Sequence, residues 1–323
     1  MTRILSYNIL VGATRRVDPL TTMIKAACPD IVGLVEATDL QVVEEVARRL
    51  EMQYVMSAPP HHIQDWQVAL LTRLPILYTK AHFRPHVLRN PILEVGLEEP
   101  GGRQLSVFVT HLSAAFSKGW AGDAIRRREV RELLSITVTK QGTPHLVMGD
   151  FNALAPGDPF KASSLLRYVV HLDQRYRHNP DAMTGQPHLD FVVPGPLRVF
   201  NPLLRLIPRS KLLCTIFDRA ASVYAPRGSI SLLRNAGYVD CFRNMNPWAE
   251  GFTCPAAAPA GRIDFIFASP ELAESLTSCY IPNQAGDIRG DQASDHLPVV
   301  AEFGELVGKD HVSMGAHVEE VKI

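Results

Sequence analysis

The chain has no long apolar run, no paired cysteines and no excess of one charge. No stretch approaches the roughly 18 apolar residues of a membrane-spanning helix. The five cysteines are scattered without a CxxC pair, which argues against a zinc knuckle or a disulfide framework and predicts buried free thiols. Because 33 basic residues balance 33 acidic ones, bulk charge cannot attach the whole chain to nucleic acid or to a membrane.

Other absences narrow the class of protein further. The first eight residues turn polar too soon for a signal peptide and have the pattern of a strand, so we expect a cytoplasmic protein. The 12 histidines include no HExxH motif, which argues against a zinc enzyme. Hydrophobic residues make up 46% and charged residues 20%, a balance that is typical of a globular protein and excludes a disordered one.

Apolar patterning predicts strands and helices that alternate along most of the chain, which indicates an α/β fold. Strands are expected at residues 3–8, 31–36, 53–57, 67–72, 76–83, 92–97, 105–110, 145–148, 262–268 and 298–303. Helices are expected at residues 18–28, with Asp18 as N-cap, from Thr38 onward, with Gln41 completing a capping box, and at residues 123–140, 229–236 and 270–275. We expect one domain over residues 1–305, with a basic, proline-rich insertion at about 161–234 and a polar tail at 306–323.

Polar side chains gather where the apolar strands begin or end. They are Asn8, Glu36, His111, Asp150, Asn152, Asp264, Asp295 and His296. Since a strand end is rigid and opens onto a crevice, these side chains can converge on one site. Carboxylate oxygens suit Mg²⁺ or Mn²⁺, while amides and imidazoles contact phosphate oxygens without adding charge.

Some of these residues also have a purely structural explanation. Asp150 and Asn152, after Gly149, fit an Asx turn, and His296 fits a solvated loop. Asp264 is harder to explain in this way, because a carboxylate between apolar neighbours is costly unless it is paired.

Two further features are expected at the surface. Arg126–Arg128, together with Arg131, form either a solvated helix face or a phosphate clamp, and the solvated face is the simpler explanation. The loop at residues 58–66, which contains two adjacent histidines, is expected to be solvated. By its place between two strands this loop can reach the rim of the site, where Trp66 or Gln67 would contact substrate.

Six short motifs follow one another along the chain: SYN (6–8), GLVEA (33–37), THL (110–112), GDFNA (149–153), RIDFIF (262–267) and SDHLPV (294–299). In these motifs the sequence resembles the endonuclease/exonuclease/phosphatase superfamily, which includes deoxyribonucleases, sphingomyelinases and inositol-polyphosphate phosphatases. The resemblance implies a four-layered α-β-β-α sandwich in which two mixed β-sheets pack face to face. It also implies hydrolysis of a phosphoester by in-line attack of water, with Mg²⁺ or Mn²⁺ as cofactor.

The resemblance implies a role for each site residue. Glu36 is the principal metal ligand, assisted by Asn8 and Asp295. His296 is the catalytic histidine, which Asp264 orients and charges, and such a carboxylate raises the basicity of an imidazole.

The remaining roles concern water and phosphate. Asp150 positions or deprotonates the attacking water, while Asn152, His111 and Asn8 bind the scissile phosphate. The resemblance leaves open whether Asp150 or His296 is the general base.

The substrate is less well defined than the reaction. Residues 161–234 contain eleven basic and four acidic residues. This insertion is a structural flap that completes the core, a basic wall for DNA or RNA, or a segment that touches lipid. We expect a monomeric phosphodiesterase or nuclease; the alternatives are a phosphatase, a phospholipid phosphodiesterase and an inactive binding module of the same fold.

Overall fold

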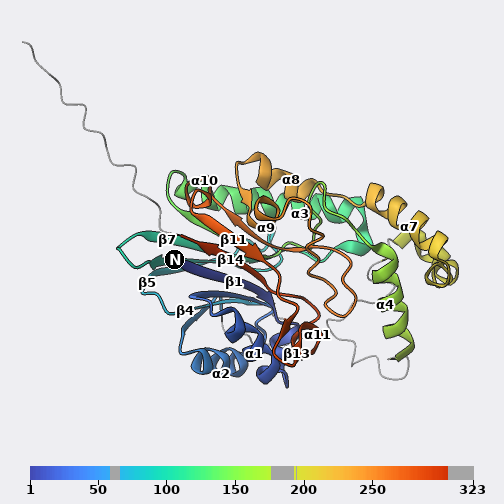
Figure 1. Cartoon of the computed structure of the whole chain (residues 1–323). Coiled ribbons are helices and arrows are strands. Elements are labelled where there is room, and N and C mark those ends of the chain that lie inside the picture. The colour runs from blue at the N-terminus through green and yellow to red at the C-terminus, as the bar shows by residue number, and fades with distance from the viewer. Residues whose placement is uncertain (59–65, 176–192, 194, 305–323) are drawn as a thin grey trace, which may run out of the picture.

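The computed structural model describes residues 1–58, 66–175, 193 and 195–304 of the chain (Figure 1). Two mixed six-stranded sheets pack face to face, and helices cover both outer faces, so the predicted four-layered sandwich is confirmed. The predicted tail at 306–323 and the adjacent histidines of the 58–66 loop lie outside the described residues. Within the described part, no helix is long and apolar enough to span a bilayer.

The strand order is β11-β14-β1-β2-β4-β3 in the first sheet and β5-β6-β7-β8-β10-β9 in the second. The strands of the first sheet are β1 (Thr2–Asn8), β2 (Ile31–Val35), β3 (Gln53–Met56), β4 (Val68–Thr72), β11 (Leu276–Tyr280) and β14 (Val299–Phe303). Those of the second are β5 (Ile76–His82), β6 (Ile92–Glu98), β7 (Gln104–His111), β8 (His145–Asp150), β9 (Val239–Asp240) and β10 (Asp264–Ala268). The predicted strands agree with these bounds to within two residues, whereas β9 and β11 were not predicted.

Each sheet is built around one parallel pair of strands. β1 lies parallel to β2, and β7 lies parallel to β8, while the other pairings of the described strands are antiparallel. Both parallel pairs are joined by a crossover helix, as parallel strands require. The two sheets therefore repeat the same β-α-β arrangement.

The longer helices of the described residues form three groups, and the shorter ones are named here with them. They are α1 (Val17–Ala27), α2 (Leu40–Leu50), α3 (Trp120–Thr137), α4 (Ala162–Arg175), α6 (Asn201–Leu204), α7 (Lys211–Tyr224), α8 (Gly228–Asn235), α9 (Cys241–Met245), α10 (Pro270–Ala273) and α11 (Gly290–Ala293). α1 and α2 pack on the first sheet, and α3 and α8 pack on the second. α4 and α7 lie together at one end of the sandwich, on the right in Figure 1.

The strands supply separate cores to their two faces. In β1, Ile4 packs in the core between the sheets, and Leu5 packs under α1 and α2, because successive side chains of a strand point to opposite faces. Gly33 of β2 faces Met148 of β8, and a Cβ at Gly33 would lie 2.5 Å from the Cε of Met148. Glycine at this position lets the two sheets approach closely.

Two predicted helix starts are wrong. α1 begins one residue before Asp18, and no side chain caps it. α2 is capped by Asp39 instead of Thr38, since the Asp39 carboxylate accepts from the backbone N–H of Gln41 (3.0 Å). Aspartate and threonine are both good N-caps, so the sequence alone did not distinguish two adjacent candidates.

Two predictions about burial are also wrong. The predicted solvated face holds for Arg127, Arg128 and Arg131, which are exposed, but not for Arg126. Arg126 is 2% exposed, because it lies four residues before the buried Val130 on the face that α3 turns toward the second sheet. Cys28 is exposed, since it is the left-handed C-cap of α1, whereas Cys241 and Cys279 are buried free thiols as expected.

The insertion is helical where the structure describes it. α4 buries Leu166, Val169 and Leu172, and Phe217 of α7 packs against this cluster. α7 itself contains no residue that is fully buried. Apolar residues of the insertion therefore contribute to a core in α4, as one reading of the sequence predicted, but not along the outer side of α7.

Gly149 gives a test of the backbone at the end of β8. Its φ is +140°, and a Cβ there would lie 1.9 Å from the carbonyl oxygen of Thr110. We expect Gly149→Ala to lower the free energy of unfolding by about 2–4 kcal/mol in urea denaturation, because backbone atoms must move. Gly142→Ala is the control, since Gly142 also has a positive φ (+77°) but no atom within 4 Å of an added Cβ. Equal losses in the two variants would contradict the role of the contact with Thr110.

Candidate active site

Three of the predicted site residues form one row across the second sheet. The β7–β8 register pairs His111 with Asp150, and the β8–β10 register pairs Asp150 with Asp264. All three side chains are buried. Backbone pairing alone therefore fixes these groups side by side at one edge of the sheet.

Asn8 links this row to the first sheet. Its Nδ2 donates to Glu36 Oε1 (3.1 Å) and to Asp150 Oδ2 (3.0 Å), and its Oδ1 accepts from the backbone N–H of Leu10 (3.0 Å). Asn8 ends β1, Glu36 follows β2 and Asp150 ends β8. A single amide thus holds two carboxylates from opposite sheets, and the carboxyl ends of both parallel pairs meet there.

A left-handed turn after β1 orients Glu36. Leu10, Val11, Gly12 and Ala13 all have positive φ values, between 48° and 68°. The backbone N–H of Val11 donates to Glu36 Oε2 (2.8 Å), and that of Gly12 donates to the Glu36 carbonyl oxygen (2.8 Å). A positive φ is strained for a β-branched residue such as Val11, and backbone strain of this kind clusters at functional sites. Apart from the glycine, no residue of this segment predicts the turn.

His296 and Asp264 form the predicted histidine–carboxylate pair. His296 Nδ1 donates to Asp264 Oδ2 (2.8 Å), and His296 Nε2 lies 3.9 Å from Asp150 Oδ2. Burial alone would lower the pKa of His296, but the negative charges of Asp264 and Asp295 together raise it well above its ordinary value. The pair therefore favours an imidazolium with a fixed orientation.

Asp150 is a carboxyl group with an unusual proton affinity. Its Oδ1 accepts from the backbone N–H of Asn152 (2.8 Å). Burial and the nearby Asp264 raise the pKa of Asp150 to about 8, because both disfavour the charged form. A group with a pKa near neutrality can both accept and release a proton.

His111 is a neutral imidazole at the same edge. Burial, followed by the charges of His296 and Arg89, lowers the pKa of His111 to about 3. Its Nδ1 has no hydrogen-bond partner among the described residues. Trp66 contacts the ring edge to face, with 6.4 Å between ring centroids, so Trp66 lies where the sequence placed the rim of the site.

Asn152 occupies a left-handed conformation (φ +47°) directly after β8. Its Nδ2 donates to the backbone carbonyl of Leu112, the first residue after the central strand β7 (2.9 Å). The Asx turn that the sequence allowed is therefore present, since Asp150 also accepts from the Asn152 backbone. The same turn brings the Asn152 amide beside His111, so the structural and the functional explanations are compatible.

Two residues that the sequence did not single out hold the loop of Asp295. The Ser294 hydroxyl donates to the last carbonyl of β1 (2.7 Å). The Arg16 guanidinium donates to the carbonyl oxygens of Leu10 and Ala293, and so joins the left-handed turn to the loop before β14. Ser294 was part of a motif, but Arg16 stands outside every motif and had no signal of its own.

The site accumulates buried negative charge. Its four carboxyl groups belong to Glu36, Asp150, Asp264 and Asp295. Burial raises the pKa of Glu36, Asp150 and Asp295, each of which also feels another carboxylate of the group. A divalent cation would offset this repulsion, so the donor set fits a metal on grounds of charge.

Two groups of side chains are candidate ligands for such a cation. The oxygens of Glu36, Asp295 and Asn8 form the set that the sequence predicted, and carboxylate and amide oxygens suit Mg²⁺ or Mn²⁺. Asp150, Asp264 and His296 also present possible ligand atoms within 4.8 Å of one another. Hydrogen bonds already engage members of both groups: Asn8 and the backbone N–H of Val11 donate to Glu36, and His296 donates to Asp264. Hydrogen bonding therefore does not distinguish the two sets.

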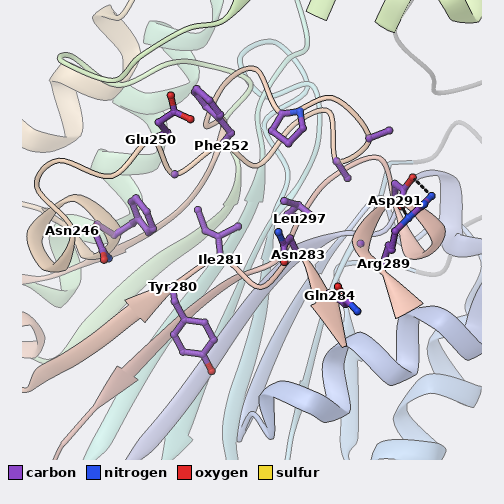
Figure 2. Close-up of a pocket in the computed structure, with 16 residues that line it drawn as sticks. Asn246, Glu250, Phe252, Tyr280, Ile281, Asn283, Gln284, Arg289, Asp291 and Leu297 are labelled. Atoms are coloured by element: carbon purple, nitrogen blue, oxygen red, sulfur yellow. Dashed lines mark hydrogen bonds and ion pairs between the residues drawn. The ribbon is translucent and has the colours of Figure 1, made fainter. Parts of the chain in front are cut away.

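A groove of about 720 Å³ lies beside the site (Figure 2). Leu297 lines it, next in the chain to His296, together with Asn246, Tyr280 and the ion pair of Arg289 and Asp291 (2.9 Å). None of the eight predicted site residues lines this groove. The groove is thus a neighbour of the candidate active site and not part of it.

The histidine–carboxylate pair makes a direct prediction. In Asp264→Asn the pKa of His296 should fall by about 1 to 3 pH units, because the largest opposing charge is removed from a buried imidazole. An NMR titration of the histidine ring signals measures this shift. His145, whose Nε2 lies 2.7 Å from the hydroxyl of Tyr238, serves as the reference and should titrate as before. An unchanged His296 would contradict the proposed electrostatic pairing.

Comparisons with known proteins agree with this arrangement. The family model described as Endonuclease/Exonuclease/phosphatase family matches residues 5–296. No curated protein matches the chain. Among solved structures, an AP endonuclease from Archaeoglobus fulgidus is similar at a TM-score of 0.60 and 16% identity, covering 94% of this chain and 99% of that chain.

Two structures of the Neisseria enzyme NExo show the same fold. A 3′-5′ exonuclease from Neisseria meningitidis matches at a TM-score of 0.58 and 16% identity, with 94% of this chain and 99% of that chain covered. The structure of the 3′ phosphatase from Neisseria, bound to a product DNA hairpin, matches at a TM-score of 0.59 and 14% identity. The match covers 94% of this chain and 100% of that chain. The family model spans most of the sequence and both sheets of the sandwich, so the chain belongs to the endonuclease/exonuclease/phosphatase family.

Proposed function

We propose that this protein is a divalent-metal-dependent phosphodiesterase that attacks its substrate with water. Membership in a family of endonucleases, exonucleases and phosphatases supports phosphoester hydrolysis in general. The observation that carries the more specific proposal is the bridge from Asn8 to Glu36 and Asp150, because it joins a candidate metal ligand to a candidate base. An inactive binding module would have no need to keep these costly buried carboxylates together.

In this proposal neutral and cationic donors receive the phosphate. His111 is uncharged at neutral pH and can donate one hydrogen bond, and Asn152 adds an amide beside it. The His296 imidazolium stabilises the negative charge that develops on the phosphoryl oxygens. Glu36, Asn8 and Asp295 would hold the metal ion, which when bound polarises a phosphoryl oxygen as a Lewis acid.

Asp150 is the group we assign as the general base. His296 is already protonated at neutral pH because of its raised pKa, so it is a poor acceptor for the proton of water. Asp150 has a pKa of about 8, so its ionised, proton-accepting form is the minor one at neutral pH and becomes the major one above pH 8. It lies 3.9 Å from both His111 Nε2 and His296 Nε2, next to the groups that receive the phosphate. A base with a pKa near the working pH transfers protons efficiently.

Nucleic acid is the substrate class we favour. The insertion has eleven basic and four acidic residues although the whole chain is neutral. Arg227 donates to the backbone carbonyls of Ala155 and Asp158, just beyond the GDFNA motif, and so ties the insertion to this motif. Cations near a phosphodiester site raise the local concentration of a polyanion. The DNA product in the Neisseria phosphatase structure is compatible with this choice.

The metal requirement is testable with a phosphoester panel. Purified protein should cleave at least one of plasmid DNA, abasic DNA, RNA, a nitrophenyl diester or phospholipid with Mg²⁺ or Mn²⁺, and EDTA should abolish cleavage. Glu36→Gln should lower kcat/KM at least about a hundredfold, because a charged metal ligand is lost. The exposed Glu98→Gln is the matched control and should retain activity. If no substrate is cleaved with metal present, the binding module becomes the better explanation.

The choice of base has its own test. We expect Asp150→Asn to lower kcat by about 100- to 10,000-fold at neutral pH. Its residual rate should then rise with hydroxide concentration, because hydroxide needs no base to attack phosphorus. The residual rate of His296→Ala should not rise in this way. If His296→Ala shows the hydroxide dependence and Asp150→Asn does not, His296 is the base.

A further inference from the structure

The outer side of the insertion has a large exposed apolar surface. We call it the apolar platform, and its main members are Val199, Leu203, Leu212, Ile216, Val223 and Tyr224. These side chains are between 45% and 87% exposed. The segments that carry them, within residues 195–224, contact one another. Scattered single apolar residues on a surface need no explanation, but many on adjoining segments indicate a contact site.

Only one of the two faces of α7 packs against the rest of the protein. On the inner face, Asp218 accepts from the backbone N–H and the hydroxyl of Ser163 of α4, at 2.6 and 2.9 Å. On the outer face, Leu212, Ile216 and Val223 follow one another at spacings of four and seven residues and so share one stripe. α7 lies at the outer end of the molecule, away from both sheets (Figure 1). The apolar residues of its outer stripe therefore do not contribute to the hydrophobic core.

The charge around the platform has one sign. Arg209, Lys211 and Arg219 are exposed among its apolar residues, and Arg205, which pairs with Asp173 at 3.3 Å, is exposed as well. Between residues 195 and 227 the single acidic residue is Asp218, which the bonds to Ser163 hold on the inner face. A partner must therefore offer both apolar volume and negative charge.

The platform also continues onto the sandwich. Tyr224 contacts Trp120 edge to face, with ring centroids 6.0 Å apart. Trp120 is 59% exposed and begins α3, the helix that follows the strand end carrying His111. Tryptophan and tyrosine favour the boundary between water and lipid, because each has an apolar body and a polar tip. The surface thus extends from the insertion onto the first residue of α3.

We propose that the apolar platform docks on a membrane surface that contains anionic phospholipid. Such a surface supplies acyl chains for the apolar stripe and phosphate groups for the exposed cations, as basic apolar helices require. The binding itself does not depend on the proposed hydrolysis.

Sedimentation with vesicles tests the docking. The full chain should sediment with vesicles made of equal parts of phosphatidylglycerol and phosphatidylcholine, much less with phosphatidylcholine alone, and less at high salt. The combined variant Leu212→Glu, Ile216→Glu and Val223→Glu should bind at least about tenfold more weakly, because three acyl contacts become repulsive charges. Its activity on a soluble nitrophenyl diester and its thermal unfolding should match those of the unchanged chain, which shows that it folds.

Three further variants serve as controls. Arg209→Glu with Lys211→Glu should also weaken binding while leaving the apolar stripe intact. Val138→Glu places the same charge on an exposed apolar residue at the far end of α3 from Trp120 and should bind normally. His296→Ala should lose hydrolysis but still bind vesicles, so a failure of the proposed activity and a failure of docking can be told apart.

Several outcomes would overturn the proposal. It fails if the unchanged chain does not sediment with the anionic vesicles, or if the triple variant binds as well as Val138→Glu. It also fails if gel filtration shows a dimer that the triple variant disrupts, since the platform is then a contact between two copies. Loss of duplex DNA binding in the triple variant, without vesicle binding by the unchanged chain, would assign the platform to nucleic acid.

Discussion

The burial of negative charge at the strand ends is the constraint on which the rest of the structure depends. Each buried carboxylate needs hydrogen-bond donors in place of water. The donors are the Asn8 amide, the backbone N–H of Val11, the backbone N–H of Asn152 and the His296 ring. These donors come from segments that are far apart in the sequence. Meeting the needs of the carboxylates therefore fixes how the two sheets are placed.

The left-handed turn shows what this placement costs. Several consecutive residues with positive φ would each be unfavourable in isolation, by about 1–3 kcal/mol in the strained cases. The turn persists because its N–H groups bond Glu36 and because Arg16 binds its carbonyl oxygen. The strained turn thus orients a single carboxylate, which fits the proposed role of Glu36 as a metal ligand.

Much of the fold could be predicted from the sequence, because buried strands such as residues 31–35 and 105–110 are long apolar runs with clear ends. The edge strand β11 was missed, since its half-exposed sequence LTSCY has no such run. The eight candidate site residues were predicted from their places at strand ends and from the motifs, and the structure places them near one another. Arg16 and the turn were missed because their contacts are made by backbone carbonyl groups, which any sequence possesses. The burial of Arg126 depends on which face α3 turns toward the second sheet, and the sequence of the helix alone does not determine this.

The repeated β-α-β arrangement has a consequence for how the protein can fail. The first unit contributes Asn8 and Glu36, and the second contributes His111 and Asp150, so neither contains a complete site. The two units come from separate parts of the chain and meet through the core between the sheets. The proposed activity then depends on the interface between the two sheets. A small increase in the distance between the sheets would separate the site residues and abolish turnover, although every helix and strand remained folded.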